Sequence, residues 1–144
     1  MPAVIPDLWP ADIFSTPRVT PIAVLRTQGD ALGARTHNFV HGDVETSTSA
    51  DGKQFAHTLH IAAPLIRYRK ALLRVDQPQL APYPAMVVET DLTKQPNANY
   101  WSRSVADEQE LQESLREFFN EPRVKEILRS VINLSNDVAP ADGE

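Results

Sequence analysis

The chain has 144 residues, of which 42% are hydrophobic and 23% charged, with a formal net charge of -5. This size suits one domain with a single core, and the acidic balance gives no overall attraction to nucleic acid or anionic lipid. The chain has no cysteine, which excludes disulfides, thiolate zinc sites and cysteine nucleophiles. No signal peptide or apolar run of about 18 residues is recognisable. We therefore expect a cytoplasmic protein that partners neither membranes nor nucleic acid.

The first segment, residues 1–19, alternates prolines with large apolar residues. It cannot form a regular helix, yet it is too apolar for a solvated tail. We interpret it as an arm that either covers the core or sheet edge of its own domain, or is exchanged with a second subunit or inserted into another partner. The residues predicted to make this interaction are Leu8, Trp9, Ile13 and Phe14.

A helix is predicted to follow, because Thr20 is a good N-cap and Pro21 suits the first helical position. Gly33 is the expected C-cap. Gly29 lies on the apolar stripe, which predicts close packing of this helix against a sheet. The stripe consists of Ile22, Leu25, Gly29 and Leu32.

Residues 38–62 are predicted to form a β-hairpin around a two-residue Asp51-Gly52 turn. This register places the apolar residues of both strands on one face, whereas a one-residue slip would set the two patterns at odds. The predicted pairs are Ala50–Lys53, Thr48–Phe55, Thr46–His57, Val44–Leu59 and Gly42–Ile61.

The opposite face of this hairpin carries His41, Asp43, Glu45 and His60, with Asp43 directly across from His60. Imidazole nitrogens and carboxylate oxygens could hold zinc, iron or manganese. Alternating polar residues are equally typical of a half-solvated antiparallel sheet, so both interpretations stay open. His57 projects instead from the apolar face, where we expect the hydroxyl of Thr46 to satisfy its ring.

A third strand is predicted from Tyr68 to Val75, and basic residues lie within it and directly before it. Basic side chains around an aromatic ring can grip phosphates while the ring stacks on a base. Their aliphatic stems can also cover a strand without binding anything. The simple alternation predicts Arg69 and Arg74 on opposite faces. The four basic residues are Arg67, Arg69, Lys70 and Arg74.

The C-terminal half predicts a fourth strand over residues 85–91, a loop over 92–100 and then two helices. Ser104 and Asp107 resemble a capping box for the first of these helices, and Pro122 marks the start of the second. Residues 135–144 are predicted to be a disordered acidic tail. The apolar positions of the two helices are Leu111, Leu115 and Phe118, then Val124, Ile127, Leu128 and Val131.

This order of elements predicts the α+β class, with an antiparallel sheet of about four strands, and an N-terminal helix and two C-terminal helices packed on one face. Residues 20–134 would form one domain. Residues 20–89 resemble a group of small uncharacterised bacterial proteins in the segments LGART, GDVETSTS, FAHTLHIAAPL, YRKALLRV and YP. The resemblance implies a bacterial origin and carries no activity.

Phosphate-binding loops, dinucleotide fingerprints, zinc-protease motifs and nucleophile elbows are not recognisable in this sequence. We therefore expect a non-enzymatic protein without a cofactor that acts through protein contacts, with another protein or a homo-oligomer, such as a homodimer, as its partner. The alternative is a hydrolase-like enzyme that holds a divalent metal through His41, Asp43, Glu45 and His60. A third hypothesis is nucleic-acid binding through residues 67–74.

Overall fold

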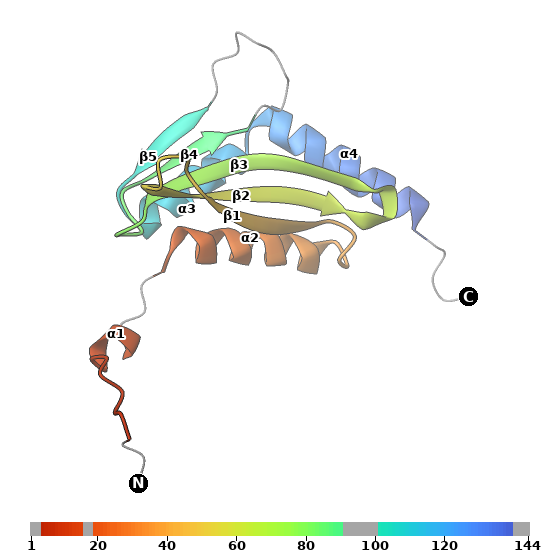
Figure 1. Ribbon diagram of the computed structural model, residues 1–144. Coiled ribbons are helices and arrows are strands. Elements are labelled where there is room, and N and C mark those ends of the chain that lie inside the picture. The colour runs from red at the N-terminus through yellow and green to blue at the C-terminus, as the bar shows by residue number, and fades with distance from the viewer. Residues whose placement is uncertain (1–3, 16–18, 91–100, 140–144) are drawn as a thin grey trace.

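The structure, a computed structural model, describes residues 4–15, 19–90 and 101–139 (Figure 1). The elements in this part of the chain are α1 (Asp12–Ser15), α2 (Pro21–Arg35), β1 (His41–Thr48), β2 (Gln54–Ala63), the 3-10 turn η1 (Pro64–Ile66), β3 (Tyr68–Pro78), β4 (Ala85–Glu89), β5 (Ser102–Val105), α3 (Glu108–Phe119) and α4 (Pro122–Val138). The strands form one antiparallel sheet in the order β1-β2-β3-β4-β5. The predicted α+β class is confirmed, with five strands rather than about four. None of the described helices has the length and apolar content needed to cross a membrane.

The core lies between one face of the sheet and the three long helices (Figure 1). Each layer contributes fully buried side chains, such as Leu25 of α2, Leu59 of β2, Leu73 of β3 and Phe118 of α3. The predicted apolar stripe of α3 is confirmed, because Leu111, Leu115 and Phe118 are at most 2% exposed. Burial of each such side chain stabilises the fold by about 1.5–3 kcal/mol. Among residues 4–15, 19–90 and 101–139, no long helix lies on the other face of the sheet.

Helix α2 begins as predicted, because the hydroxyl of Thr20 accepts a hydrogen bond from the backbone N–H of Ala23. The predicted end at Gly33 is wrong. The helix continues to Arg35, and Thr36 is its C-cap. Gly33 is buried within the helix, and its carbonyl accepts a hydrogen bond from the N–H of Asn38 at 2.8 Å. Capping is therefore achieved by the residues after the helix rather than by a glycine.

Helix α2 also makes the close approach that Gly29 predicts. A Cβ atom on Gly29 would lie 2.5 Å from the backbone oxygen of Gly42 in β1. The helix backbone therefore rests directly on the strand backbone at this point. Only a pair of glycines permits that separation.

The β1–β2 register is confirmed from Thr48–Phe55 through Gly42–Ile61, including Asp43 opposite His60. The predicted two-residue turn is wrong, however. The N–H of Gly52 donates to the carbonyl of Ser49 at 2.9 Å, so the reversal starts earlier and includes Ala50. Asp51 shapes the turn by accepting hydrogen bonds from the Ser49 hydroxyl and the Lys53 N–H, and these bonds lower the pKa of its carboxyl group.

Strand β3 contains a β-bulge that the sequence pattern does not predict. Leu59 pairs with Leu73 while its neighbour His60 pairs with Ala71, so Leu72 is the extra residue. Both Leu72 and Leu73 are fully buried, because two neighbouring leucines can reach the core only where the alternation breaks. The bulge shifts every residue after it, which places Arg74 on the same face as Arg69, contrary to prediction.

Strand β5 was not predicted. Ser104, expected to cap a helix, lies on this strand opposite Met86, and Asp107 caps α3 by accepting from the N–H of Glu110. The segment has one buried apolar residue, Val105, and therefore carries almost no strand periodicity. At the other end of the C-terminal region, α4 extends to Val138, so that residues 135–138 of the predicted tail are helical. The predicted loop 92–100 lies outside the described residues.

Candidate functional site

The predicted metal cluster occupies the face of the β1–β2 hairpin that the long helices leave uncovered. Nε2 of His41 lies 3.3 Å from Oδ1 of Asp43. Oε1 of Glu45 instead binds Nη2 of Arg69 on β3 at 2.5 Å. Nδ1 of His60 is buried and has no hydrogen-bond partner among the described residues. The fold brings His41 and Asp43 together and directs Glu45 elsewhere, and no described group of three or more such side chains is placed to hold a metal ion.

His57 lies on the core face as predicted and is 4% exposed. Its Nδ1 atom lies 2.8 Å from the hydroxyl of Thr46, which confirms the expected partner. Its Nε2 atom lies 2.7 Å from Oε1 of Gln77, a contact made across the next strand pair. Because the amide oxygen can only accept, Nε2 carries the proton. Thr46, His57 and Gln77 thus form a hydrogen-bonded row in which both ring nitrogens of His57 have a partner.

We expect the substitution His57→Leu to lower the free energy of unfolding by about 1–2 kcal/mol, because it leaves the buried amide oxygen of Gln77 without a donor. Thr46→Val should cost less, since Thr46 is exposed and water can replace its hydroxyl. Urea unfolding of the two variants tests this ranking. If both variants lose the same free energy of unfolding, the buried contact between His57 and Gln77 does not contribute more than the contact with Thr46.

The basic residues of β3 do not form one positive surface. Arg69 binds Glu45, and Arg74 forms two hydrogen bonds with Asp76, at 2.7 Å and 3.1 Å. Lys70 lies on the opposite face from Arg69 by strand alternation, and Arg67 occupies a left-handed turn with φ of 53°. The two guanidinium groups on the uncovered face therefore already have carboxylate partners.

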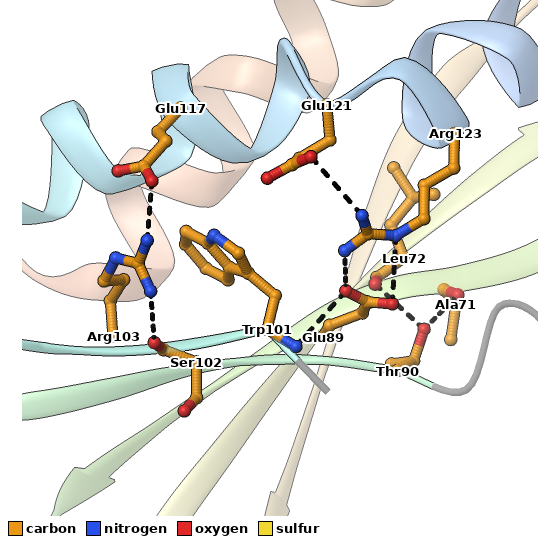
Figure 2. Close-up of polar contacts among 10 residues, drawn as sticks. All are labelled: Ala71, Leu72, Glu89, Thr90, Trp101, Ser102, Arg103, Glu117, Glu121 and Arg123. Carbon is orange, nitrogen blue, oxygen red and sulfur yellow. Dashed lines mark hydrogen bonds and ion pairs between the residues drawn. The ribbon is translucent and has the colours of Figure 1, made fainter. Parts of the chain in front are cut away.

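An ion pair that the sequence analysis did not predict joins the buried carboxylate of Glu89 on β4 to Arg123 on α4 (Figure 2). Glu89 is 8% exposed, and both its carboxylate oxygens accept hydrogen bonds from the guanidinium of Arg123. The backbone N–H of Trp101 donates to Oε2 of Glu89 at 3.4 Å. Oε2 of Glu121 lies 3.4 Å from Nη1 of Arg123. Hydrogen bonding to Glu89 raises the pKa of Arg123.

The neighbouring contacts extend this cluster over the surface of α3 (Figure 2). The guanidinium carbon of Arg103 lies 4.8 Å from the centre of the Trp101 ring, and Arg103 also binds Glu117 at 2.6 Å. The Trp101 ring packs against Phe118 with 5.3 Å between ring centres. All the charges are paired, so this cluster fixes β4, β5, α3 and α4 to one another. A signal was available in the sequence, because an arginine in the first turn of a helix opposes the helix dipole and needs a partner elsewhere.

An apolar groove lies between α2 and α4, with the sheet as its floor. We call it the α2–α4 groove. Its volume is about 450 Å³, which is within the range of small-ligand sites. Polar groups reach it from α2 through Gln28, Arg35 and Thr36. Its apolar lining includes Leu32, Leu59, Ile61, Leu72, Phe119 and Leu128.

The N-terminal arm leaves its apolar side chains in solvent over the described residues. Leu8 is 80% exposed, Trp9 is 71% exposed and Ile13 is 54% exposed. Helix α1 is a single turn set apart from the body of the protein (Figure 1). The side chain of Phe14, the fourth predicted interaction residue, is outside the part that the structure describes.

Comparison of the chain with family models, curated proteins and solved structures found no significant match. The resemblance to small bacterial proteins therefore stays a prediction. Two apolar features stand out in the part of the chain that the structure describes, the exposed arm and the α2–α4 groove.

Proposed function

We propose that this is a non-enzymatic cytoplasmic protein that acts through protein contacts made by its N-terminal arm, with a second copy of the chain as the partner. The exposure of the arm carries the proposal. Apolar side chains that cluster in solvent mark interaction sites, and tryptophan is enriched among the residues that dominate binding energy. The absence of cysteine favours the cytoplasm as the compartment.

The arm has the composition of an interface core rather than of a solvated tail. Its described side chains include Val4, which is 92% exposed, and Ile5, which is 82% exposed, in addition to those already named. An extended segment with prolines also loses less conformational entropy on binding than a flexible one. Burial on a partner would therefore be favourable for this segment.

Sedimentation of the whole chain over a range of concentrations tests the proposal. We expect a species with twice the 16.0 kDa mass of the chain. A variant with Leu8→Ser, Trp9→Ser and Ile13→Ser should raise the dissociation constant at least about tenfold. Loss of one buried apolar side chain removes about 1.5–3 kcal/mol, and 1.4 kcal/mol corresponds to a factor of ten.

The matched control replaces exposed apolar residues outside the arm. Leu80 is 101% exposed in the β3–β4 connection and Leu134 is 50% exposed on α4, so Leu80→Ser with Leu134→Ser also replaces exposed apolar side chains by serine. This control should dimerise as the unmodified chain does. A chain that sediments as a monomer at every concentration would overturn the proposal.

A further inference from the structure

We propose that the arm of one copy occupies the α2–α4 groove of the other copy. This inference rests on the proposed function and names the surface that receives the arm. The groove and the arm are complementary in polarity, since both expose apolar side chains that water disfavours. Every chain carries one arm and one groove, so the two are always present in equal amounts.

The groove has the shape and lining to accept side chains of this kind. Leu59, Ile61 and Leu72 form a floor that belongs to the rigid sheet, and each is at most 2% exposed. Leu32 and Leu128 form opposite walls from α2 and α4, and both are only partly buried. Insertion of a leucine or an indole ring would complete the burial of these walls.

Charge favours the same occupant. The charged side chains of the arm, residues 1–19, are Asp7, Asp12 and Arg18, and both acidic ones lie within residues 4–15. Arg35 lines the groove and is exposed, and no described acidic side chain forms an ion pair with it. An arm that enters the groove would thus bring acidic groups to a basic rim, which fixes orientation more than it adds affinity.

The place where the arm leaves the domain favours a second copy over the same chain. The hydroxyl of Tyr83 donates to the carbonyl of Val19 at 3.2 Å, which holds the chain beside the β3–β4 connection just before α2. The described part of the arm, with helix α1, lies apart from the body beyond the N-terminal end of α2 (Figure 1). The groove lies along the later part of this helix, from Gln28 to Thr36. The described part of the arm and the groove therefore lie toward opposite ends of α2.

Reciprocal exchange also closes the assembly. Each copy offers one arm and one groove, so two copies related by a twofold axis satisfy both contacts. The buried area is doubled relative to a single arm, and neither arm remains in solvent. The expected product is a dimer that does not grow further with concentration.

Disulfide trapping tests this geometry, because the unmodified chain has no cysteine. Ala11→Cys lies in the arm between Trp9 and Ile13, and Ala31→Cys lies in the groove wall on α2. The two single variants, one of them carrying a size tag, are mixed and oxidised. The matched control mixes Ala11→Cys with Ser104→Cys, an exposed position on β5. We expect at least about tenfold more mixed disulfide with Ala31→Cys than with Ser104→Cys.

Two outcomes would overturn the assignment of the groove. One is an equal yield of mixed disulfide with Ala31→Cys and Ser104→Cys. The other is an internal disulfide that forms in monomers of a variant carrying both Ala11→Cys and Ala31→Cys, at a rate independent of dilution. If the chain dimerises through its arm and either result is obtained, only the groove assignment fails. A monomeric chain removes the proposed function as well.

A dye supplies a second measurement. Anilinonaphthalene sulfonate fluoresces when it enters apolar sites, so its fluorescence should rise at least about twofold when the arm carries Leu8→Ser, Trp9→Ser and Ile13→Ser and leaves the groove open. Equal fluorescence with the unmodified dimer would mean that the groove takes small apolar molecules and not the arm, which contradicts the proposal.

Discussion

Replacement of Gly29 by alanine should lower the free energy of unfolding by about 2 kcal/mol. The new Cβ atom would lie 2.5 Å from the backbone oxygen of Gly42 and 2.9 Å from its carbonyl carbon, so α2 or β1 has to move. Overpacking of this kind costs about 1–3 kcal/mol and occasionally more. The gain in helix propensity, about 0.5–1 kcal/mol, offsets only part of that cost. Urea unfolding monitored by circular dichroism measures the difference.

Gly33 provides the matched control on the same helix. A Cβ atom there would lie 3.1 Å from the Oδ1 atom of Asn38 and 3.4 Å from the Cβ atom of His41, and the Asn38 side chain can rotate away. Gly33→Ala should therefore be neutral or stabilising by up to about 1 kcal/mol. Equal losses for the two variants would show that the Gly29–Gly42 contact is not what holds α2 against the sheet.

The substitution Arg123→Met should lower the free energy of unfolding by about 2–4 kcal/mol. It leaves the carboxylate of Glu89, whose side chain is 7% exposed, without its main partner. Loss of one partner from a fully buried pair costs about 3–5 kcal/mol. The expected cost here is smaller because the side chain of Arg123 is 36% exposed and water can approach the site.

Two comparisons identify the cause of this loss. A double variant, Glu89→Leu with Arg123→Met, should recover most of the stability, because it removes the stranded charge as well as its partner. Arg103→Met breaks the ion pair with Glu117, whose side chains are 46% and 52% exposed, and should cost less than about 1 kcal/mol. No recovery in the double variant would indicate lost packing of the Arg123 stem rather than an unpaired carboxylate.

The sequence predicted those elements whose signals are local and repeated. Thr20 before Pro21 marks a helix start by the chemistry of the first turn alone. The hairpin register follows from alternation on both strands, which a slip would destroy at every position. The same local chemistry identified Thr46 as the partner of His57, since the two face each other once the register is set.

Signals that depend on neighbours distant in the sequence were misread. The bulge at Leu72 exists because the core on one side of the sheet takes two consecutive leucines, and this demand is visible only when the helices are in place. Strand β5 forms because β4 offers an unpaired edge, while its own sequence, from Ser102 to Val105, has little strand character. Gly33 resembled a helix end, but it lies inside the helix, where α2 passes close to Asn38 and His41.

The candidate sites divide in the same way. The sequence alone determined that His41, Asp43 and Glu45 share a face with His60, because strand alternation fixes which side each occupies. Only the tertiary structure decided that Glu45 turns to Arg69, since ion pairs across strands depend on the register of β3. Likewise the sequence alone shows that residues 1–19 alternate prolines with large apolar residues. The α2–α4 groove is created by three helices and a sheet that meet although they are distant in the chain, and no local pattern encodes such a surface.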